Sequence, residues 1–193
     1  MLDRPYIIGI AGASCSGKTE LAKRLAQSLG AVVCALDSYY RDLAHLEMAE
    51  RARQNFDIPD ALDHQLLCEQ ISALARGEII RKPVYDFTRH VRSLETEVLE
   101  PAPIVVVEGL FTFYWQPLRD LLNLKVFIQT KDDICLQRRM ERDIRERGRT
   151  PESVRLQFEE TVRPMTHLHI DPTRSFADVV LEDRKSTRLN SSH

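Results

Sequence analysis

One run near the amino terminus combines two glycines with a lysine and a threonine at fixed spacing. The run is Gly12-Ala13-Ser14-Cys15-Ser16-Gly17-Lys18-Thr19. It fits the pattern G-x-x-x-x-G-K-[ST], in which backbone N–H groups surround phosphate oxygens and the glycines let the backbone approach them. We expect Lys18 to reach the β- and γ-phosphates and Thr19 to bind Mg²⁺. The run therefore predicts a site for a nucleoside triphosphate.

The segments on either side of this run have the context that the pattern requires. Residues 6–11 are apolar, as in a buried strand, and residues 20–29 carry leucines at helical spacing before Gly30. A chance glycine turn before a helix is the alternative. The order of strand, glycine loop and helix favours the phosphate site.

Two acidic residues lie where predicted strands end. Asp37 follows the apolar run 31–36, and Glu108 lies near the end of the β-branched run 103–110. Ligands of parallel sheets bind at the carboxyl ends of strands, so both carboxylates are candidates for the same site. A helix N-cap is an equally good interpretation of Asp37. Glu108 resembles an acid that helps to hold Mg²⁺, which we favour over a stray surface glutamate.

The chain between these two acids offers groups for a second ligand. The polar loop 48–63 holds Asp57, Asp60 and Asp63, which could bind a hydroxylated ligand or a metal, or could simply cap the next helix and face solvent. Residues 79–98 alternate as a hairpin does. Its aromatic residues Tyr85 and Phe87 share one face, with His90 nearby. They predict either hairpin packing or a wall for a flat base.

Arginines are concentrated in a predicted helix at 132–146 and the loop after it. Six fall within twelve residues: Arg138, Arg139, Arg142, Arg145, Arg147 and Arg149. Neighbouring acidic residues allow an exposed face of salt bridges. Guanidinium groups also bind phosphate oxygens bidentately, so the phosphate loop in the same chain favours a mobile lid over the triphosphate. Nucleic-acid binding is disfavoured by the net charge of −2.

Five predicted strands alternate with helices, which indicates an α/β fold with a parallel sheet. The last two strands are expected at 124–129 and 176–181, and further helices at 63–76 and at 151–163, where Pro164 should end the helix. We expect a five-stranded sheet of the P-loop NTPase type, flanked by helices, with a small β-hairpin subdomain for the substrate and an arginine-rich lid.

Composition favours an ordinary cytoplasmic protein. The chain has 193 residues, of which 43% are hydrophobic and 29% are charged, and no stretch resembles a signal peptide or a membrane span. The four cysteines are widely spaced, so reduced thiols are expected rather than a zinc site or a disulfide framework. The chain therefore predicts one domain at residues 1–182.

The last eleven residues, 183–193, differ from the rest of the chain. They resemble a sequencing adapter translated in frame, so we expect a non-native tail and a domain that is truncated at its carboxyl end.

Taken in order, the motifs resemble the uridine/cytidine kinase family of P-loop kinases, in the phosphoribulokinase/uridine kinase group. The resemblance covers about residues 6–181. The blocks that carry it, besides the phosphate loop, are Asp37-Ser38-Tyr39-Tyr40, Asn55-Phe56-Asp57, Pro59-Asp60-Ala61, Pro83-Val84-Tyr85-Asp86-Phe87, Glu108-Gly109, Arg138-Arg139, Arg142-Asp143-Ile144, Arg147-Gly148-Arg149 and Val162-Arg163-Pro164-Met165.

The resemblance implies a role for each matching position. Asp37 and Lys18 correspond to catalytic residues, with Asp37 accepting the proton of the ribose 5′-hydroxyl. The phosphate loop from Gly12 to Thr19 would bind the nucleotide together with Arg142, Arg147 and Arg149. The Mg²⁺ ligands would be Thr19, Asp37 and Glu108. The nucleoside would contact Asp57, through its ribose hydroxyls, and Tyr85, Phe87, His90, Arg139 and Gln157.

The implied reaction is ATP-dependent phosphorylation of uridine or cytidine, with GTP as an alternative donor. The resemblance also implies a homo-oligomer, commonly a tetramer, and no nucleic acid or membrane partner. Departures from the family are Ala13 and Cys15 where glycine is usual, Ile58 where histidine is usual, and the lack of a further helix after the last strand. The alternatives are a kinase of the same fold that acts on ribulose phosphate or pantothenate, and a nucleotide-binding regulatory module or NTPase.

Overall fold

The computed structural model describes residues 4–183, so the adapter-like tail lies outside the described residues except for Asp183. Within the described range, no helix is both long enough and apolar enough to cross a membrane.

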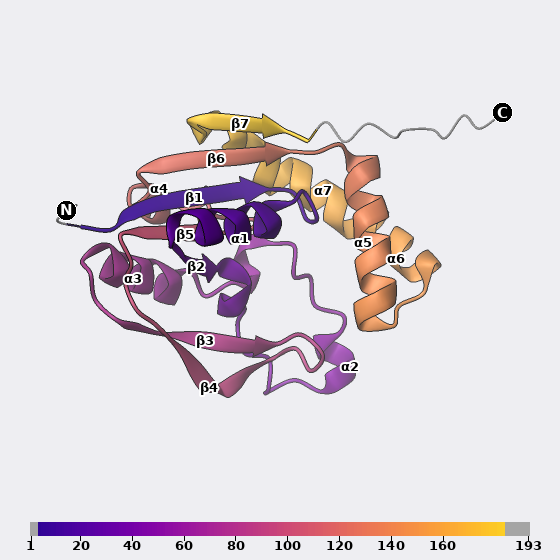
Figure 1. Ribbon diagram of the computed structural model, residues 1–193. Coiled ribbons are helices and arrows are strands. Elements are labelled where there is room, and N and C mark those ends of the chain that lie inside the picture. The colour runs from indigo at the N-terminus through magenta and orange to yellow at the C-terminus, as the bar shows by residue number, and fades with distance from the viewer. Residues whose placement is uncertain (1–3, 184–193) are drawn as a thin grey trace.

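A five-stranded parallel sheet forms the centre of the fold (Figure 1). In spatial order its strands are β2 (Val32–Ala35), β5 (Ile104–Glu108), β1 (Tyr6–Gly12), β6 (Leu124–Gln129) and β7 (Val179–Glu182). Every neighbouring pair is parallel. The α/β fold with a five-stranded parallel sheet is thereby confirmed, and its central strands are apolar runs because helices cover both of their faces.

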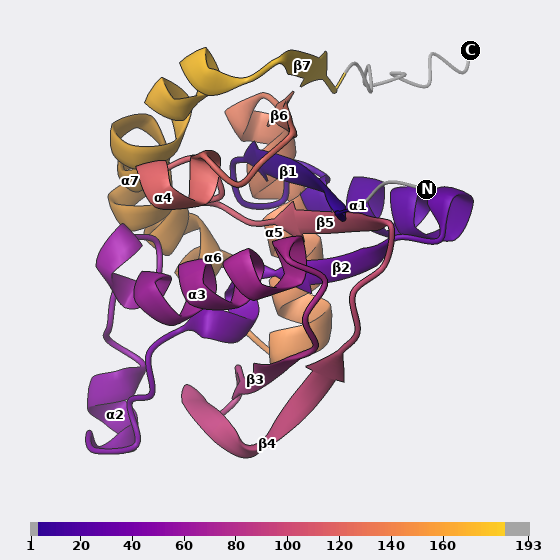
Figure 2. The ribbon, with the colours of Figure 1, turned by 90° about the vertical axis from the view of Figure 1, so that its left-hand side faces the viewer.

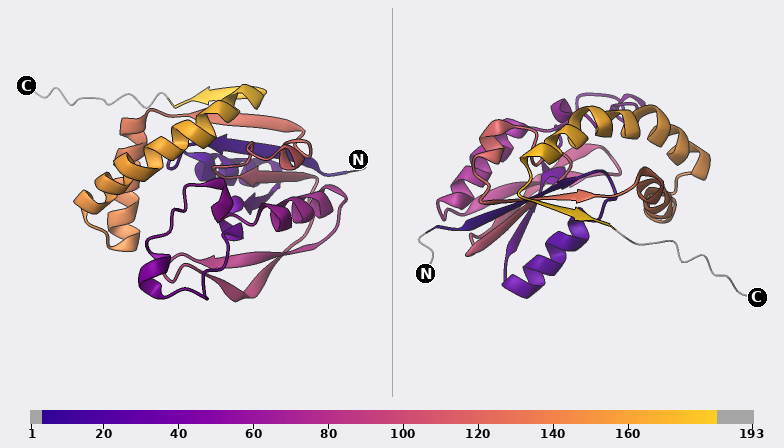
Figure 3. Two further views of the ribbon diagram at one scale, coloured as in Figure 1. Left: turned by 180° about the vertical axis from the view of Figure 1, so that it is seen from behind. Right: turned by 90° about the horizontal axis from the view of Figure 1, so that it is seen from above.

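The helices on the two faces build two separate apolar layers. On one face, Ala22 of α1 (Lys18–Leu29) packs in a cluster with Ile10 and Val106 of the sheet. The other face packs against α3 (His64–Ala75), α4 (Gln116–Arg119) and a long helical stretch before β7. Figure 2 shows α3 and α4 on this second face, and Figure 3 shows the stretch before β7 opposite α1.

A separate two-stranded sheet lies beyond the β2 edge (Figure 1). It is the predicted hairpin, made of β3 (Ile80–Asp86) and β4 (Val91–Leu99). Arg92 of β4 donates to the carbonyl oxygens of Tyr39 and Tyr40, at 3.0 and 2.8 Å. These bonds fasten the hairpin to the short turn η1 (Leu36–Tyr39), which follows β2. The short elements η2 (Pro59–Ala61) and α2 (Met48–Arg51) complete this side.

The arginine-rich helix α5 (Asp132–Arg147) stands at the carboxyl ends of the strands (Figure 1). It ends at Gly148, whose φ of 60° is in the left-handed region that glycine adopts without penalty. Helix α6 (Pro151–Gln157) follows, with the Thr150 side chain accepting a hydrogen bond from the Ser153 N–H at its N-terminus. The chain thus turns back on itself directly after the arginines.

The expectation that Pro164 ends a helix is wrong. Helical structure continues through η3 (Phe158–Val162), α7 (Arg163–Met165), η4 (Thr166–Ile170) and η5 (Asp171–Phe176). The wide π-turn η3 ends two residues before Pro164, and the backbone is right-handed helical on both sides of the proline, at Val162 and at Thr166. Because a π-turn bonds each N–H to the carbonyl five residues earlier, the proline ring and its missing N–H meet a different backbone from that of a regular α-helix, in which they would break the helix. The resulting stretch crosses the sheet and leads into β7.

Candidate active site

The phosphate loop has the backbone that its glycines allow. Gly12 has φ of 149°, and a Cβ there would lie 2.5 Å from the carbonyl oxygen of Ile128. Gly17 has φ of 103° at the start of α1. Lys18 Nζ donates to the Ala13 carbonyl oxygen at 2.7 Å, so the lysine already curls back over the loop. Ser16 Oγ is buried without a hydrogen-bond partner among residues 4–183, which suits a ligand oxygen.

The two predicted acids lie close enough beside this loop for the charge of Asp37 to act on Glu108. Because β2 and β5 pair with Ala35 opposite Glu108, the chain leaves β2 toward Asp37 next to that glutamate. Thr19 Oγ1 donates to Glu108 Oε1 at 2.9 Å. Ala35, rather than Asp37, occupies the N-cap position of η1, so the capping interpretation of Asp37 is wrong.

Loss of solvation raises the pKa of both acids. Asp37 is open to the cleft but surrounded by protein, and this raises its pKa above the ordinary aspartate value against the opposing charges of Lys18 and Arg142. Burial likewise raises the pKa of Glu108, again opposed by Lys18. Two carboxylates held in this way are ready to receive a cation or a proton.

One cleft of about 1320 Å³ joins the parts of the site. It is lined by the predicted site residues Ser14, Cys15, Ser16, Gly17, Lys18, Thr19, Asp37, Asp57, Tyr85, Phe87, His90, Glu108, Arg139, Arg142, Arg147, Arg149 and Gln157. Gly12 and Ala13 are the predicted residues that do not line it: Gly12 shapes the loop from below, and Ala13 packs against the apolar cluster around Cys135. The cleft therefore brings together segments from the whole described chain.

An arginine of α5 connects the phosphate loop with α6. Arg139 is buried and donates to Ser14 Oγ at 3.0 Å and to Gln157 Oε1 at 3.3 Å. Gln157 Oε1 also accepts from Arg149. Arg138, which the sequence places among the lid arginines but to which it assigns no individual role, lines the cleft and donates to the Cys15 carbonyl oxygen at 3.4 Å.

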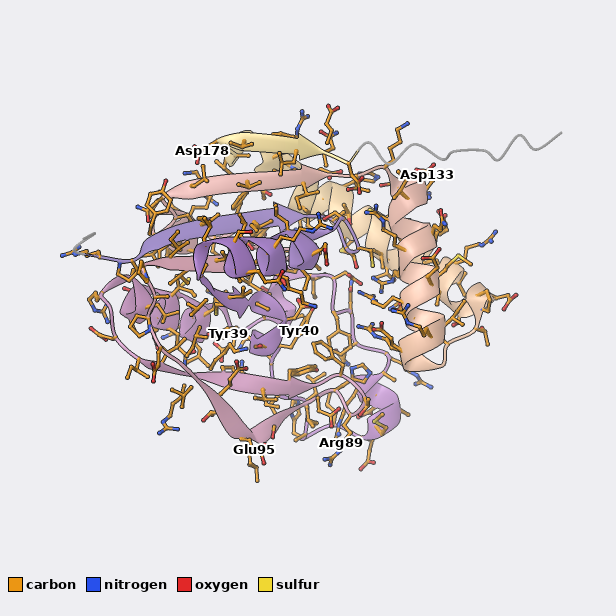
Figure 4. All side chains as sticks on the ribbon, in the orientation of Figure 1. Tyr39, Tyr40, Arg89, Glu95, Asp133 and Asp178 are labelled. Atoms are coloured by element: carbon orange, nitrogen blue, oxygen red, sulfur yellow. The ribbon has the colours of Figure 1, made fainter. Side chains whose placement is uncertain are left out.

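An aromatic cluster forms the far wall of the cleft. Tyr40 touches Tyr85 and Phe87 with ring centroids at 5.3 and 6.4 Å, and Phe56 stacks on His90 at 4.8 Å. The Tyr85 hydroxyl is buried without a hydrogen-bond partner among the described residues. Figure 4 places Tyr40 between the sheet and the hairpin.

Tyr40 and Phe56 belong to this wall although the sequence analysis assigned neither. Both line the cleft, and each lies close in sequence to a predicted site residue, Asp37 or Asp57. That proximity is the signal in the sequence. It does not show whether an aromatic side chain next to an acid faces the same site as the acid.

Hydroxyl and carboxylate oxygens at the loop suit a hard cation. Thr19, Asp37 and Glu108 supply such oxygens, and Mg²⁺ is commonly held by one or two carboxylates plus substrate phosphates rather than by a full protein cage. No group of three or more histidine, cysteine or acidic residues able to hold a metal ion occurs within residues 4–183.

Comparison with known proteins adds a family and a fold. The model of the phosphoribulokinase / uridine kinase family matches residues 7–190. The chain is 44% identical over 190 residues to a uridine kinase of Vibrio cholerae, covering 95% of this chain and 89% of the relative. It is 47% identical over 179 residues to a uridine kinase of Chloroflexus aggregans, covering 91% and 86%. A solved D-glycerate 3-kinase of Cryptococcus neoformans has a TM-score of 0.64 at 19% identity, covering 88% and 80%, and so shares the fold.

Proposed function

The chain belongs to the phosphoribulokinase / uridine kinase family, and from this premise we propose that it transfers the γ-phosphoryl group of ATP to the 5′-hydroxyl of uridine or cytidine. The observation that carries the proposal is the single cleft that joins a phosphate loop, an acid and an aromatic wall. Phosphoryl transfer needs just these parts: a held polyphosphate, an oriented hydroxyl and a dry site.

The phosphate loop and the arginines of the lid are proposed to bind the nucleotide. Lys18 is nearly buried at the loop, and Arg142, Arg147 and Arg149 line the same cleft from α5 and the turn after it. These cations would neutralise charge on the transferred group, where fixed charges in a site closed to water act most strongly.

Asp37 is proposed as the base that orients the nucleoside hydroxyl and accepts its proton. Its raised pKa brings it closer to the working pH than an ordinary aspartate, which favours proton acceptance. With Thr19 and Glu108 it would also hold Mg²⁺, which when bound neutralises phosphate charge.

The aromatic wall is proposed to bind the pyrimidine. Tyr85 and Phe87 offer ring faces, and the unpaired Tyr85 hydroxyl offers a polar contact. Burial and the charge of Arg147 lower the pKa of His90, so its neutral ring can donate and accept hydrogen bonds at neutral pH. The buried Asp57 carboxylate is proposed to accept from the ribose hydroxyls, and Arg139 and Gln157 to contact the nucleoside.

A coupled assay of ADP release tests this function. It compares uridine, cytidine, 5′-deoxyuridine, ribulose 5-phosphate and pantothenate as acceptors, and ATP and GTP as donors. We expect turnover with uridine or cytidine and none with 5′-deoxyuridine. Asp37→Asn should lose about 10²- to 10⁴-fold in kcat, the usual contribution of general acid–base catalysis.

The matched control is Asp133→Asn, an exposed acid in the first turn of α5 outside the cleft, which should retain wild-type kcat (Figure 4). Turnover with ribulose 5-phosphate or pantothenate alone would reject the nucleoside assignment. ATP hydrolysis that no acceptor stimulates would favour an NTPase. One kinase domain at residues 1–182, a homotetramer and a cytoplasmic location stay predictions.

A further inference from the structure

One buried carboxylate lies at the centre of the arginine-rich lid. Asp143 of α5 has a side-chain exposure of 0%, and four guanidinium groups surround it. Its Oδ1 is 2.8 Å from Arg142 Nη2 and 3.5 Å from Arg147 Nη1. Its Oδ2 is 3.6 Å from both Arg139 Nε and Arg149 Nη1. One acid is therefore shared by four of the six arginines in this segment.

The backbone of Asp143 brings the last of these arginines into place. Both the Gly148 and the Arg149 N–H groups donate to the Asp143 carbonyl oxygen, the latter at 3.2 Å. The chain therefore turns back at Gly148, and Arg149 faces the helix that it has just left. Asp143 organises the turn through its main chain and the guanidinium groups through its side chain.

Charge explains why such an arrangement needs an acid. Four guanidinium groups close together repel one another, and burial together with the charge of Arg142 lowers the pKa of Arg147, an effect that Asp143 opposes. A buried carboxylate without cations would itself destabilise the folded protein. Each side therefore stabilises the other.

The arrangement also leaves the arginines able to contact a further anion. Oδ2 of Asp143 and Nε of Arg139 are buried without hydrogen-bond partners among residues 4–183, so attraction rather than a full set of hydrogen bonds holds them. Arg139 extends on to Ser14 in the phosphate loop. The cluster therefore keeps an excess of positive charge directed at the cleft.

We propose that Asp143 is a positioning residue that holds Arg139, Arg142, Arg147 and Arg149 in place before the nucleotide binds. It touches no reacting atom and acts through the guanidinium groups. The inference rests on the phosphoryl transfer proposed above, and it adds a residue to which the sequence analysis gave no role in the site.

The test is Asp143→Asn in the full chain, which keeps the shape and removes the charge. We expect kcat for uridine to fall about 10- to 100-fold, as when a group that orients catalytic residues is lost, and KM for ATP to rise, because the same arginines are proposed to bind its phosphates. A second readout needs no activity: trypsin should cleave after Arg147 and Arg149 about 10-fold faster without ligand, because the freed turn opens more often.

Glu141→Gln is the matched control, since Glu141 is an exposed acid of α5 that bonds Gln137 away from the cluster. It should match wild type in both readouts. Asp143→Glu keeps the charge and should stay within about fivefold of wild-type kcat, with wild-type resistance to trypsin. If Asp143→Asn does not fold, the proposal is tested on Asp143→Glu instead. A hundredfold loss of kcat in folded Asp143→Glu would overturn the proposal.

A folded Asp143→Asn protein with wild-type kcat and wild-type trypsin sensitivity would also overturn the proposal, as would a lower Tm with unchanged kcat per folded molecule. A failure of the proposed function can be told apart from a failure of this inference. If the function is wrong, wild type does not phosphorylate uridine, whereas the comparison of trypsin cleavage still tests whether Asp143 holds the turn.

Discussion

The ammonium group of Lys82 in β3 donates a hydrogen bond to the hydroxyl of Ser38 at 3.2 Å. Lys82 is 8% exposed and also pairs with Glu97 of β4 at 2.9 Å. Since Ser38 directly follows Asp37, the hairpin that carries the aromatic wall is bonded to the turn that carries the proposed base. The substrate wall and the base are thus linked by a contact outside the cleft.

Replacing Lys82 by methionine should loosen Asp37 without opening the core. Loss of one hydrogen bond of about 1 kcal/mol corresponds to about a fivefold lower kcat if the bond orients the base. Steady-state kinetics with uridine measure it, with Arg81→Met, an exposed neighbour on β3, as the control. Equal kcat in the two variants would show that the bond only stabilises the hairpin.

The buried Asp57 should make the protein less stable as pH rises. Burial raises its folded-state pKa, so the folded state binds a proton more tightly than the unfolded state does. This contribution to stability is complete below the ordinary aspartate pKa and is lost as pH rises through the raised folded value. Asp57→Asn should therefore have a higher Tm than wild type at pH 7.5, and the difference should shrink toward pH 4.

Thermal unfolding at the two pH values checks this sign. Asp60→Asn, an exposed neighbour, should show no such pH-dependent difference. A lower Tm of Asp57→Asn at pH 7.5 would mean that attraction to Arg139 outweighs the cost of burying the carboxylate.

Gly109→Ala should displace the turn that holds Asp37. A Cβ at Gly109 would lie 2.5 Å from Leu36 Cβ, closer than packed carbons approach, so η1 must move. Overpacking of this kind costs about 1–3 kcal/mol, and we expect a lower free energy of unfolding together with a fall in kcat. Urea unfolding and uridine kinetics measure both effects.

Gly77→Ala is the comparison for that variant. No atom lies within 4 Å of a Cβ there, but φ is 80°, so the substitution should cost about 1 kcal/mol from backbone strain and leave kcat unchanged. If Gly109→Ala also keeps its kcat, Leu36 adapts without moving Asp37.

Cys15→Gly should stabilise the phosphate loop. Cys15 has φ of 62°, a left-handed conformation that costs a non-glycine residue about 1–2 kcal/mol, partly offset by the greater freedom of glycine in the unfolded chain. We expect a net gain of about 0.5 kcal/mol, measured as a higher Tm. A lower Tm would show that the thiol makes contacts worth more than the strain.

The same variant, Cys15→Gly, tests which cysteine is responsible for inhibition by a thiol reagent. N-ethylmaleimide should inhibit wild type, because Cys15 lines the cleft, and should spare Cys15→Gly, in which Cys34 and Cys135 are buried. Inhibition of both proteins alike would point to Cys68 instead.

Local patterns were sufficient for the sheet and for much of the cleft lining. The phosphate loop was recognisable because its chemistry requires glycines, Lys18 and Thr19 at fixed spacing within eight residues. Apolar runs located the strands because a buried parallel sheet requires them. The prediction that a helix ends at Pro164 was wrong, because the π-turn that accommodates the proline has no clear sequence signal.

Contacts between distant residues could not be predicted in the same way. Asp143 appeared to be one of several acids in a charged helix, and its burial among four arginines depends on the turn at Gly148 and on the packing of α6. Likewise, nothing in the sequence distinguishes Lys82 from the other basic residues of the hairpin, and only the structure shows its hydrogen bond to Ser38.

The sequence by itself determined the fold class, the phosphate loop and the candidate residues, because backbone conformation and burial follow from local residue types and their period. Tertiary structure decided which side chains come together: Asp37 and Glu108 in one cleft, Tyr40 and Phe56 with the hairpin, and Asp143 with the arginines around it. The physical reason is that electrostatic and packing partners are set by distance in space. For residues far apart in the sequence, that distance depends on how the whole chain folds.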